Sequence, residues 1–250
     1  MHRRNILGAP LVAVLAALVA VSGCSRAVDS PAAPATGGVA ATTAASPAPG
    51  AGEPGLEGTG TEPAAPPTTR AKPAPVRYRF PVAGCRAGYG RTHHDYPAAD
   101  IFSRRGCAFV APVDGRVDEV ARVDRWSPAT DRGADRGGRS VSLVGVDGVR
   151  YYGSHLEAVA PGVVKGSRVR AGQLLGRIGD SGSASGTPVH LHFGISWPTR
   201  PGIWWVRRGI VPPARYLDSW RAGGDLSPVG AVRAARAAAG REVPACRARC

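Results

Sequence analysis

Residues 140–154 read SVSLVGVDGVRYYGS, in which two short apolar runs flank Asp147-Gly148. An Asp-Gly pair between apolar runs is typical of a two-residue hairpin turn, because aspartate and glycine tolerate the positive φ angles that such a turn requires. The stretch therefore predicts two antiparallel strands, at 140–146 and 149–154.

Similar short apolar runs, separated by Gly-rich turns, lie on both sides of this hairpin. They occupy residues 109–112, 115–123, 174–178 and 189–195. No long window has helical periodicity before the Ala-rich segment 230–239, which predicts one small helix with Gly240 as its stop signal. We therefore expect an all-β, mostly antiparallel domain with short hairpins.

Aromatic residues mark the limits of this domain. All fifteen Phe, Trp and Tyr residues lie between Tyr78 and Trp220, and the segment 25–76 has 38 Ala, Pro, Gly and Thr residues among its 52 positions. A chain of that composition buries too little apolar surface to offset the entropy that is lost on ordering. We therefore expect a folded domain at 77–222, preceded by a disordered tether and followed by a tail at 223–250.

The first 23 residues have the pattern of an export signal. Arg3 and Arg4 precede an apolar run at 6–21, which is shorter than the ~20 residues of a membrane-spanning helix and suits a signal peptide. The following Val21-Ser22-Gly23-Cys24 resembles the bacterial lipobox, which implies cleavage after residue 23 and lipidation of Cys24. The alternative is an ordinary signal peptide with a chance cysteine.

A lipidated cysteine predicts where the domain works. Acyl chains hold a soluble domain at a membrane surface without spanning the bilayer. We therefore expect a signal peptide at 1–23, a lipid anchor and tether at 24–76, and a domain at the outer face of the cytoplasmic membrane. The lipid anchor is then its expected contact with the membrane.

The charge balance leaves two interpretations open. The chain carries 32 Lys+Arg against 18 Asp+Glu, for a formal net charge of +14. This excess suits acidic partners such as cell-wall polymers or anionic lipid, but a predominance of arginine is also what a GC-rich genome produces. Nucleic acid is disfavoured as a partner by the export signal. The length and composition exclude a polytopic membrane protein and a large multi-domain enzyme.

Four cysteines remain when Cys24 is set aside. They are Cys85, Cys107, Cys246 and Cys250. An even number outside the cytoplasm favours disulfides, and proximity along the chain favours Cys85–Cys107 and Cys246–Cys250 among the three possible connectivities. The alternative, a zinc site made of thiolates, lacks the usual Cys-x-x-Cys pairs.

Five histidines fall into three clusters within the predicted domain: His93-His94, His155, and His190 with His192. Because residues two apart on a strand project from the same face, His190 and His192 are expected to project together, opposite Leu191. A histidine pair alone is more often structural. Three clusters together with Asp100 favour zinc, which binds imidazole nitrogen and carboxylate oxygen.

These motifs resemble a known family. The segments Thr92–Ile101 (THHDYPAADI), Tyr152–Leu156 (YGSHL) and Val189–Phe193 (VHLHF), with the Gly-rich stretch 166–182, are similar to those of the lysostaphin-type (LytM-domain) zinc metallo-endopeptidases. The resemblance implies a small two-sheet β domain with a groove. It also implies one zinc ion and cleavage of peptide stems or cross-links in bacterial peptidoglycan.

The resemblance also implies roles for individual residues. His94, Asp100 and His192 correspond to the zinc ligands, with His93 as the alternative first ligand, and His190 and His155 correspond to the catalytic histidines. The spacing departs from the family, because Asp100 lies six positions after His94, whereas in the common H-x-x-x-D pattern the Asp lies four positions after the His. A second departure is Gly194, where the family often has Glu.

Two further residues are candidates for the groove. Tyr152 is a candidate for a hydrogen bond to substrate, although a strand tyrosine is more often packed. Ser181 lies in the Gly-rich loop before the HLH motif, and turn chemistry explains it equally well.

The alternative to an enzyme is an inactive LytM-like domain that binds peptidoglycan or regulates a cell-wall amidase. Activity is favoured because all five zinc-binding and catalytic residues are present.

Overall fold

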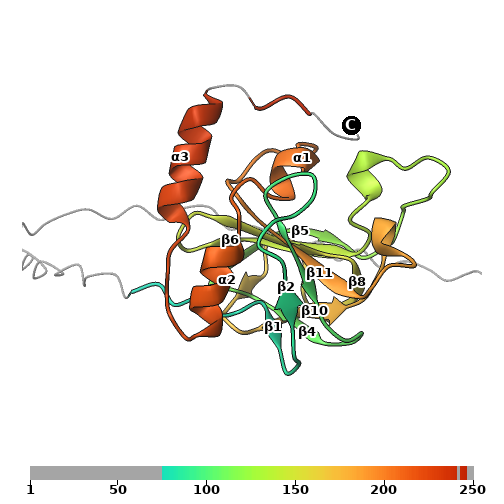
Figure 1. Ribbon diagram of the computed structural model, residues 1–250, viewed down its shortest axis with the longest axis horizontal. Coiled ribbons are helices and arrows are strands. Elements are labelled where there is room, and N and C mark those ends of the chain that lie inside the picture. Colours follow the sequence, from blue (N-terminus) through green and yellow to red (C-terminus); the bar gives the residue numbers. More distant parts are fainter. Residues whose placement is uncertain (1–74, 241–242, 247–250) are drawn as a thin grey trace, which may run out of the picture. The chain divides into compact units, whose positions relative to one another are not determined.

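The computed structural model describes residues 75–240 and 243–246 (Figure 1). The predicted signal peptide, the lipidation site Cys24 and nearly all of the predicted tether lie outside these residues. Within the described ranges, no helix is long and apolar enough to cross a membrane.

Two antiparallel sheets form the domain, as the sequence predicts. The larger sheet has the strand order β2-β3-β11-β7-β6-β5-β9 and the smaller one the order β1-β4-β10-β8. In the larger sheet the strands are β2 (Gly88–Tyr89), β3 (Ala99–Phe102), β11 (His190–Ser196), β7 (Arg150–Ser154), β6 (Ser140–Gly145), β5 (Gly115–Ala121) and β9 (Arg168–Val169). In the smaller sheet they are β1 (Val82–Ala83), β4 (Ala108–Val110), β10 (Leu174–Ile178) and β8 (Leu156–Val159). The expected all-β, two-sheet fold class is therefore confirmed.

The hairpin predicted from Asp147-Gly148 is the β6–β7 pair. Val144 lies opposite Arg150 in the register, and Gly148 has a φ of +77° in the turn between them. All six predicted strands are present, with ends that differ by a few residues. The apolar runs did not predict the five short strands β1, β2, β3, β8 and β9. One of these, β3, has only four residues, and it carries Asp100.

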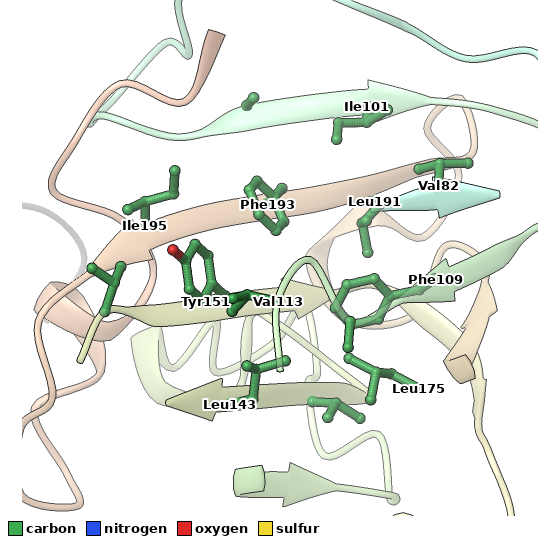
Figure 2. Close-up of a cluster of buried hydrophobic side chains, with 14 of the residues drawn as sticks. Val82, Ile101, Phe109, Val113, Leu143, Tyr151, Leu175, Leu191, Phe193 and Ile195 are labelled. Carbon is green, nitrogen blue, oxygen red and sulfur yellow. The ribbon is translucent and has the colours of Figure 1, made fainter. Parts of the chain in front are cut away.

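The core lies between the two sheets and is built by alternation along the strands. On β11, Leu191, Phe193 and Ile195 are fully buried, and Figure 2 shows them beside Tyr151 and Phe109. Because residues two apart share a face, this places His190 and His192 on the opposite face of the sheet. The core therefore fixes which face carries the histidines.

Three short α-helices follow β11 in the chain. They are α1 (Trp204–Arg207), α2 (Ala214–Arg221) and α3 (Val229–Ala239), with 3-10 helices at Gly133–Asp135 and Gly182–Ala184. The helix predicted at 230–239 is confirmed, and Gly240 follows it with a φ of +73°. Val232 of α3 belongs to the buried core cluster, so this part of the predicted tail packs on the domain.

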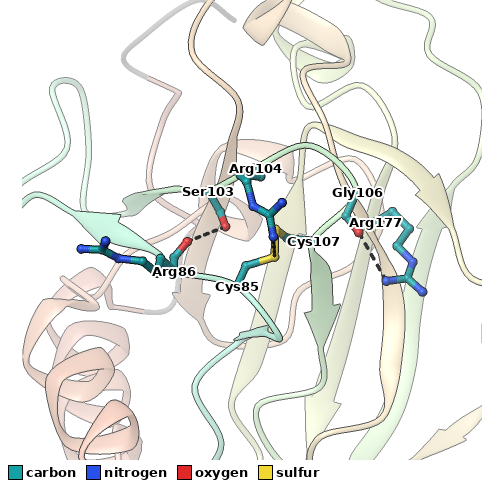
Figure 3. Close-up of a disulfide and its surroundings, with 7 residues drawn as sticks. All are labelled: Cys85, Arg86, Ser103, Arg104, Gly106, Cys107 and Arg177. Carbon is teal, nitrogen blue, oxygen red and sulfur yellow. Dashed lines mark hydrogen bonds between the residues drawn. A yellow bond between two sulfur atoms is a disulfide. The ribbon is translucent and has the colours of Figure 1, made fainter.

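A disulfide joins Cys85 to Cys107 (Figure 3). It closes a loop of 22 residues, which contains His93, His94 and Asp100. Such a cross-link stabilises the fold by about 3 kcal/mol in the chain-entropy model, mainly by restricting the unfolded chain. The other disulfide expected from the sequence, Cys246–Cys250, includes Cys250, which lies outside the described residues.

Candidate metal centre

Asp100 and His192 lie opposite each other on adjacent strands. Asp100 of β3 is the cross-strand partner of His192 of β11, and the Nδ1 atom of His192 lies 2.9 Å from the Oδ1 atom of Asp100. Directly opposed residues of an antiparallel pair project from the same face. The strand register therefore brings an imidazole and a carboxylate together on the face away from the core.

The third member of this cluster is His93, from the loop that precedes β3. Its Nε2 atom lies 3.7 Å from the Oδ2 atom of Asp100, and its side chain is only 4% exposed. One donor atom from each of His93, Asp100 and His192 falls within 4.8 Å of the others. The structure thus assembles two imidazoles and one carboxylate at a single place.

His94, the preferred first ligand of the sequence, lies outside this cluster. Its side chain is 70% exposed, and its Nδ1 atom lies 3.4 Å from the carboxylate of Asp95. The inserted residues fold back over the cluster, because the ring of Tyr96 packs 4.6 Å from that of His93 and 5.6 Å from that of His192. The structure thus places His93, the alternative first ligand, beside Asp100 and His192, and it places His94 outside this group.

The charge states of the cluster suit a cation. Burial, with a smaller contribution from the neighbouring His192, lowers the pKa of His93 to about 4. Burial alone would raise the pKa of Asp100, but its hydrogen bond with His192 and the charges of the surrounding imidazoles hold that pKa below its usual value. A neutral imidazole and an ionised carboxylate are the forms in which these side chains bind metals.

His192 can present a lone pair to the cluster. In the metal-free protein a hydrogen on its Nδ1 atom is donated to an Asp100 oxygen at 2.9 Å. Its Nε2 atom lies 3.3 Å from both the carbonyl oxygen of Arg208 and the hydroxyl of Tyr96. With the hydrogen on Nε2, donated to the Arg208 carbonyl, the Nδ1 lone pair and the Asp100 oxygen are both available to a metal ion. The donor set therefore fits a bound metal ion.

The backbone at Arg208, which orients His192, is held from two sides. A Cβ at Gly194, two residues after His192, would overlap the Arg208 carbonyl, so the strand passes close only because Gly194 has no side chain. On β7, the buried Arg150 donates from Nη1 to the Arg207 carbonyl at 2.7 Å. These contacts lock the segment that fixes the orientation of the His192 ring.

Two more histidines face the cluster, and a backbone carbonyl orients each of them. The Nδ1 atom of His190 lies 2.8 Å from the Pro188 carbonyl, and that of His155 lies 2.7 Å from the Ser181 carbonyl. Each Nδ1 therefore carries the hydrogen and leaves the Nε2 lone pair free. The two rings are 5.0 Å apart. Both histidines thus present a basic nitrogen on the side where the cluster lies.

His155 is held in an unusual environment. Its φ of +64° is in the left-handed region, which a residue with a side chain rarely adopts, and its backbone N–H donates to the Gly137 carbonyl at 3.0 Å. Burial, with a further contribution from His192 and His190, lowers its pKa to about 3. Backbone strain of this kind is concentrated at functional sites.

A cavity of about 610 Å³ opens over these groups. Its lining includes His93, Asp100, His155, His190 and His192. The expected groove is therefore present, and its lining contains both the metal-binding cluster and the two further histidines.

Comparison with known proteins identifies this part of the chain. Residues 94–201 match the sequence model of Peptidase family M23. They form a peptidase M23 domain. The L-Ala–D-Glu endopeptidase of Bacillus subtilis is 29% identical over 132 residues, which are 49% of this chain and 36% of that protein. The match thus spans about a third of the relative's length.

Solved structures similar to the M23 domain include the peptidase lysostaphin of Staphylococcus simulans. Its catalytic domain is 25% identical, with a TM-score of 0.40, over 54% of this chain and 93% of that one. A second structure of the antimicrobial peptidase lysostaphin is 26% identical, with a TM-score of 0.42, over 58% of this chain and 54% of that one.

The two residues expected in the groove, Ser181 and Tyr152, contact other parts of the M23 domain. Ser181 is buried, and its carbonyl orients His155 while its hydroxyl accepts from the Arg139 N–H at 2.9 Å. The hydroxyl of Tyr152 points at Gly137, where a Cβ would overlap it. Neither residue lines the 610 Å³ cavity, so both support its wall from behind.

Several residues in the wall of the cavity were missed from the sequence. Tyr96, Trp204, Trp205, Arg136 and Pro244 line the cavity. The indole N–H of Trp205 donates to the Pro244 carbonyl at 2.6 Å, which places a segment from near the C-terminus at the cavity wall. The only sequence signal was the cluster of tryptophans after β11, and such a cluster is more often explained by packing over the core.

Proposed function

We propose that this protein is a zinc-dependent endopeptidase that cleaves peptide bonds in the stems or cross-links of bacterial peptidoglycan. The observation that carries the proposal is the meeting of two sets of groups in one cavity: the metal-binding donors His93, Asp100 and His192, and the basic nitrogens of His155 and His190. The M23 relatives are peptidoglycan endopeptidases, which supports a substrate in the cell wall.

The donor set is the reason for proposing zinc. Two imidazoles and one carboxylate are a common set of protein ligands at catalytic zinc sites, which keep a further position open. A zinc ion held by His93, Asp100 and His192 would act as a Lewis acid that polarises a peptide carbonyl and makes water more acidic.

His190 and His155 supply the proton chemistry. Each can accept a proton at its free Nε2 atom, while its Nδ1–H continues to donate to a backbone carbonyl, so protonation needs no rotation of the ring. We assign His190 as the general base that takes a proton from the attacking water. The proton that His190 accepts at Nε2 is then passed to the leaving amine, directly or through His155. A ring that carries a proton at Nε2, His155 or both rings together, donates a hydrogen bond to the developing negative charge.

The test is peptide release from peptidoglycan. The chain from residue 25 onward is incubated with purified sacculi, and released peptides are identified by mass spectrometry. We expect release that a chelator abolishes and added zinc restores. His190→Ala is expected to lower the rate about 100-fold or more, as removal of a general base usually does.

The same assay distinguishes the alternative function. An inactive domain that binds peptidoglycan or regulates an amidase would sediment with sacculi and release no peptide at any zinc concentration. The presence of all five groups in one cavity favours the enzyme.

We also propose that the protein is a lipoprotein at the outer face of the cytoplasmic membrane. The support is the apolar run at 6–21 followed by VSGC at 21–24. Wild-type protein is expected in the membrane fraction and Cys24→Ala in the soluble one, in fractionated cells that express each form. A Cys24→Ala protein that stays in the membrane fraction contradicts lipid anchoring.

A further inference from the structure

Buried polar atoms without a partner point to one further residue of the site. Four such side-chain atoms occur among the described residues: Ser154 Oγ, Ser196 Oγ, Thr199 Oγ1 and Arg207 Nε. Of these four, only Ser154 belongs to a residue that lines the 610 Å³ cavity. The residue is only 1% exposed, and its pairing with His192 puts its side chain on the face of the sheet that carries the cluster.

The strand register places Ser154 next to the metal-binding cluster. It is the last residue of β7 and the cross-strand partner of His192 on β11, and His155 follows it in the chain. Gly137, also in the cavity wall, lies beside the Ser154 Cβ atom and has no side chain to cover it. The Ser154 hydroxyl is therefore adjacent to a proposed ligand and to a proposed catalytic histidine.

The chemistry around Ser154 determines what its hydroxyl can do there. A buried polar group without a partner costs stability, and it is tolerated where a ligand supplies the missing hydrogen bond. His155 and His190 each use Nδ1 for a backbone carbonyl, which leaves Nε2 as the nitrogen available to a ligand in the cavity. The Ser154 O–H adds a hydrogen-bond donor to this set of groups.

We infer that Ser154 is a substrate-binding residue, whose hydroxyl donates to a backbone carbonyl oxygen of the bound peptide beside the bond that is cut. This inference rests on the proposed function, because it takes a peptide as the occupant of the cavity. A peptide suits it, since each residue of a peptide chain brings a carbonyl acceptor. The roles proposed above for the metal ligands and the two catalytic histidines do not change.

The experiment compares Ser154→Ala with Ser196→Ala. Ser196 is the matched control, because it is also a fully buried serine with an unpaired hydroxyl, and it lies on the adjacent strand β11 outside the cavity lining. Three quantities are measured for each: kcat/KM for peptide release from soluble peptidoglycan fragments, their Kd by calorimetry, and the Tm.

We expect Ser154→Ala to weaken kcat/KM and binding about tenfold, the effect of losing one hydrogen bond, with an unchanged or raised Tm. Ser196→Ala is expected to keep wild-type activity and affinity, and Ser154→Thr to keep most of both. A purely structural role for the hydroxyl predicts the same behaviour for both serines.

Each failure has its own signature. If the wild type cuts and Ser154→Ala cuts and binds equally well, the inference is overturned and the proposed function stands. If the wild type binds fragments without cutting them, the proposed activity fails, and the affinity of Ser154→Ala decides the inference. If the wild type neither binds nor cuts, both are overturned.

Discussion

Replacing His93 with alanine is expected to remove the bound metal and lower peptide release at least about 100-fold, because a catalytic metal contributes several kcal/mol of transition-state stabilisation. The Nε2 atom of His93 lies 3.7 Å from Asp100, and its side chain is 4% exposed. Metal content is measured by atomic spectroscopy on protein purified with added zinc, and activity by the sacculus assay.

His94→Ala is the matched control, since it removes the same side chain one residue later. The His94 side chain is 70% exposed and lies near Asp95 rather than Asp100. This variant is expected to keep one metal ion per chain and to retain activity within about threefold, the range of a surface contact. The reverse result, with metal lost in His94→Ala and kept in His93→Ala, would restore the assignment made from the sequence.

The His93–His94 question shows where sequence reasoning reached its limit. The family spacing required one histidine before Asp100, and two adjacent histidines were present. Which of the two histidines lies beside Asp100 depends on how the inserted loop folds. In the structure the ring of Tyr96 in this loop packs against the rings of both His93 and His192. That packing involves residues far apart in the chain, and no local pattern encodes it.

Elsewhere, local signals were sufficient. The Asp147-Gly148 turn predicted the β6–β7 hairpin, and alternation predicted that His190 and His192 share a face opposite Leu191. Proximity predicted the Cys85–Cys107 disulfide. In contrast, Ser181 was singled out for its place in a loop, and its carbonyl orients His155. A backbone carbonyl looks the same in every residue, so no side-chain pattern could have given that role.

Gly194→Ala is expected to damage both the fold and the metal site. A Cβ at this position would overlap the Arg208 carbonyl, a backbone atom that cannot rotate away. We expect the free energy of unfolding to fall by about 3 kcal/mol, the upper part of the usual range for overpacking a tight contact. Chemical denaturation of the metal-free protein measures this change.

The effect on the metal follows from the second contact of the same carbonyl. Arg208 O also accepts from the Nε2–H of His192 at 3.3 Å, so a displaced carbonyl releases the ring that holds Nδ1 toward Asp100. Loss of such an outer partner usually costs about 10–100-fold in metal affinity, and zinc titration against a competing chelator is expected to give a weakening in this range.

Gly230→Ala separates this effect from the general cost of replacing glycine. Gly230 lies in helix α3, and an added Cβ there has no heavy atom within 4 Å. Alanine in a helix is expected to stabilise the protein by about 0.5–1 kcal/mol without changing zinc affinity. If Gly194→Ala matched the wild type in both measurements, the Arg208 carbonyl would not lie against β11. In that case the glycine at position 194, where lysostaphin-type enzymes often have glutamate, would need another explanation. If the two variants shift stability in opposite directions, and only Gly194→Ala weakens zinc, the close approach at Gly194 is what orients His192.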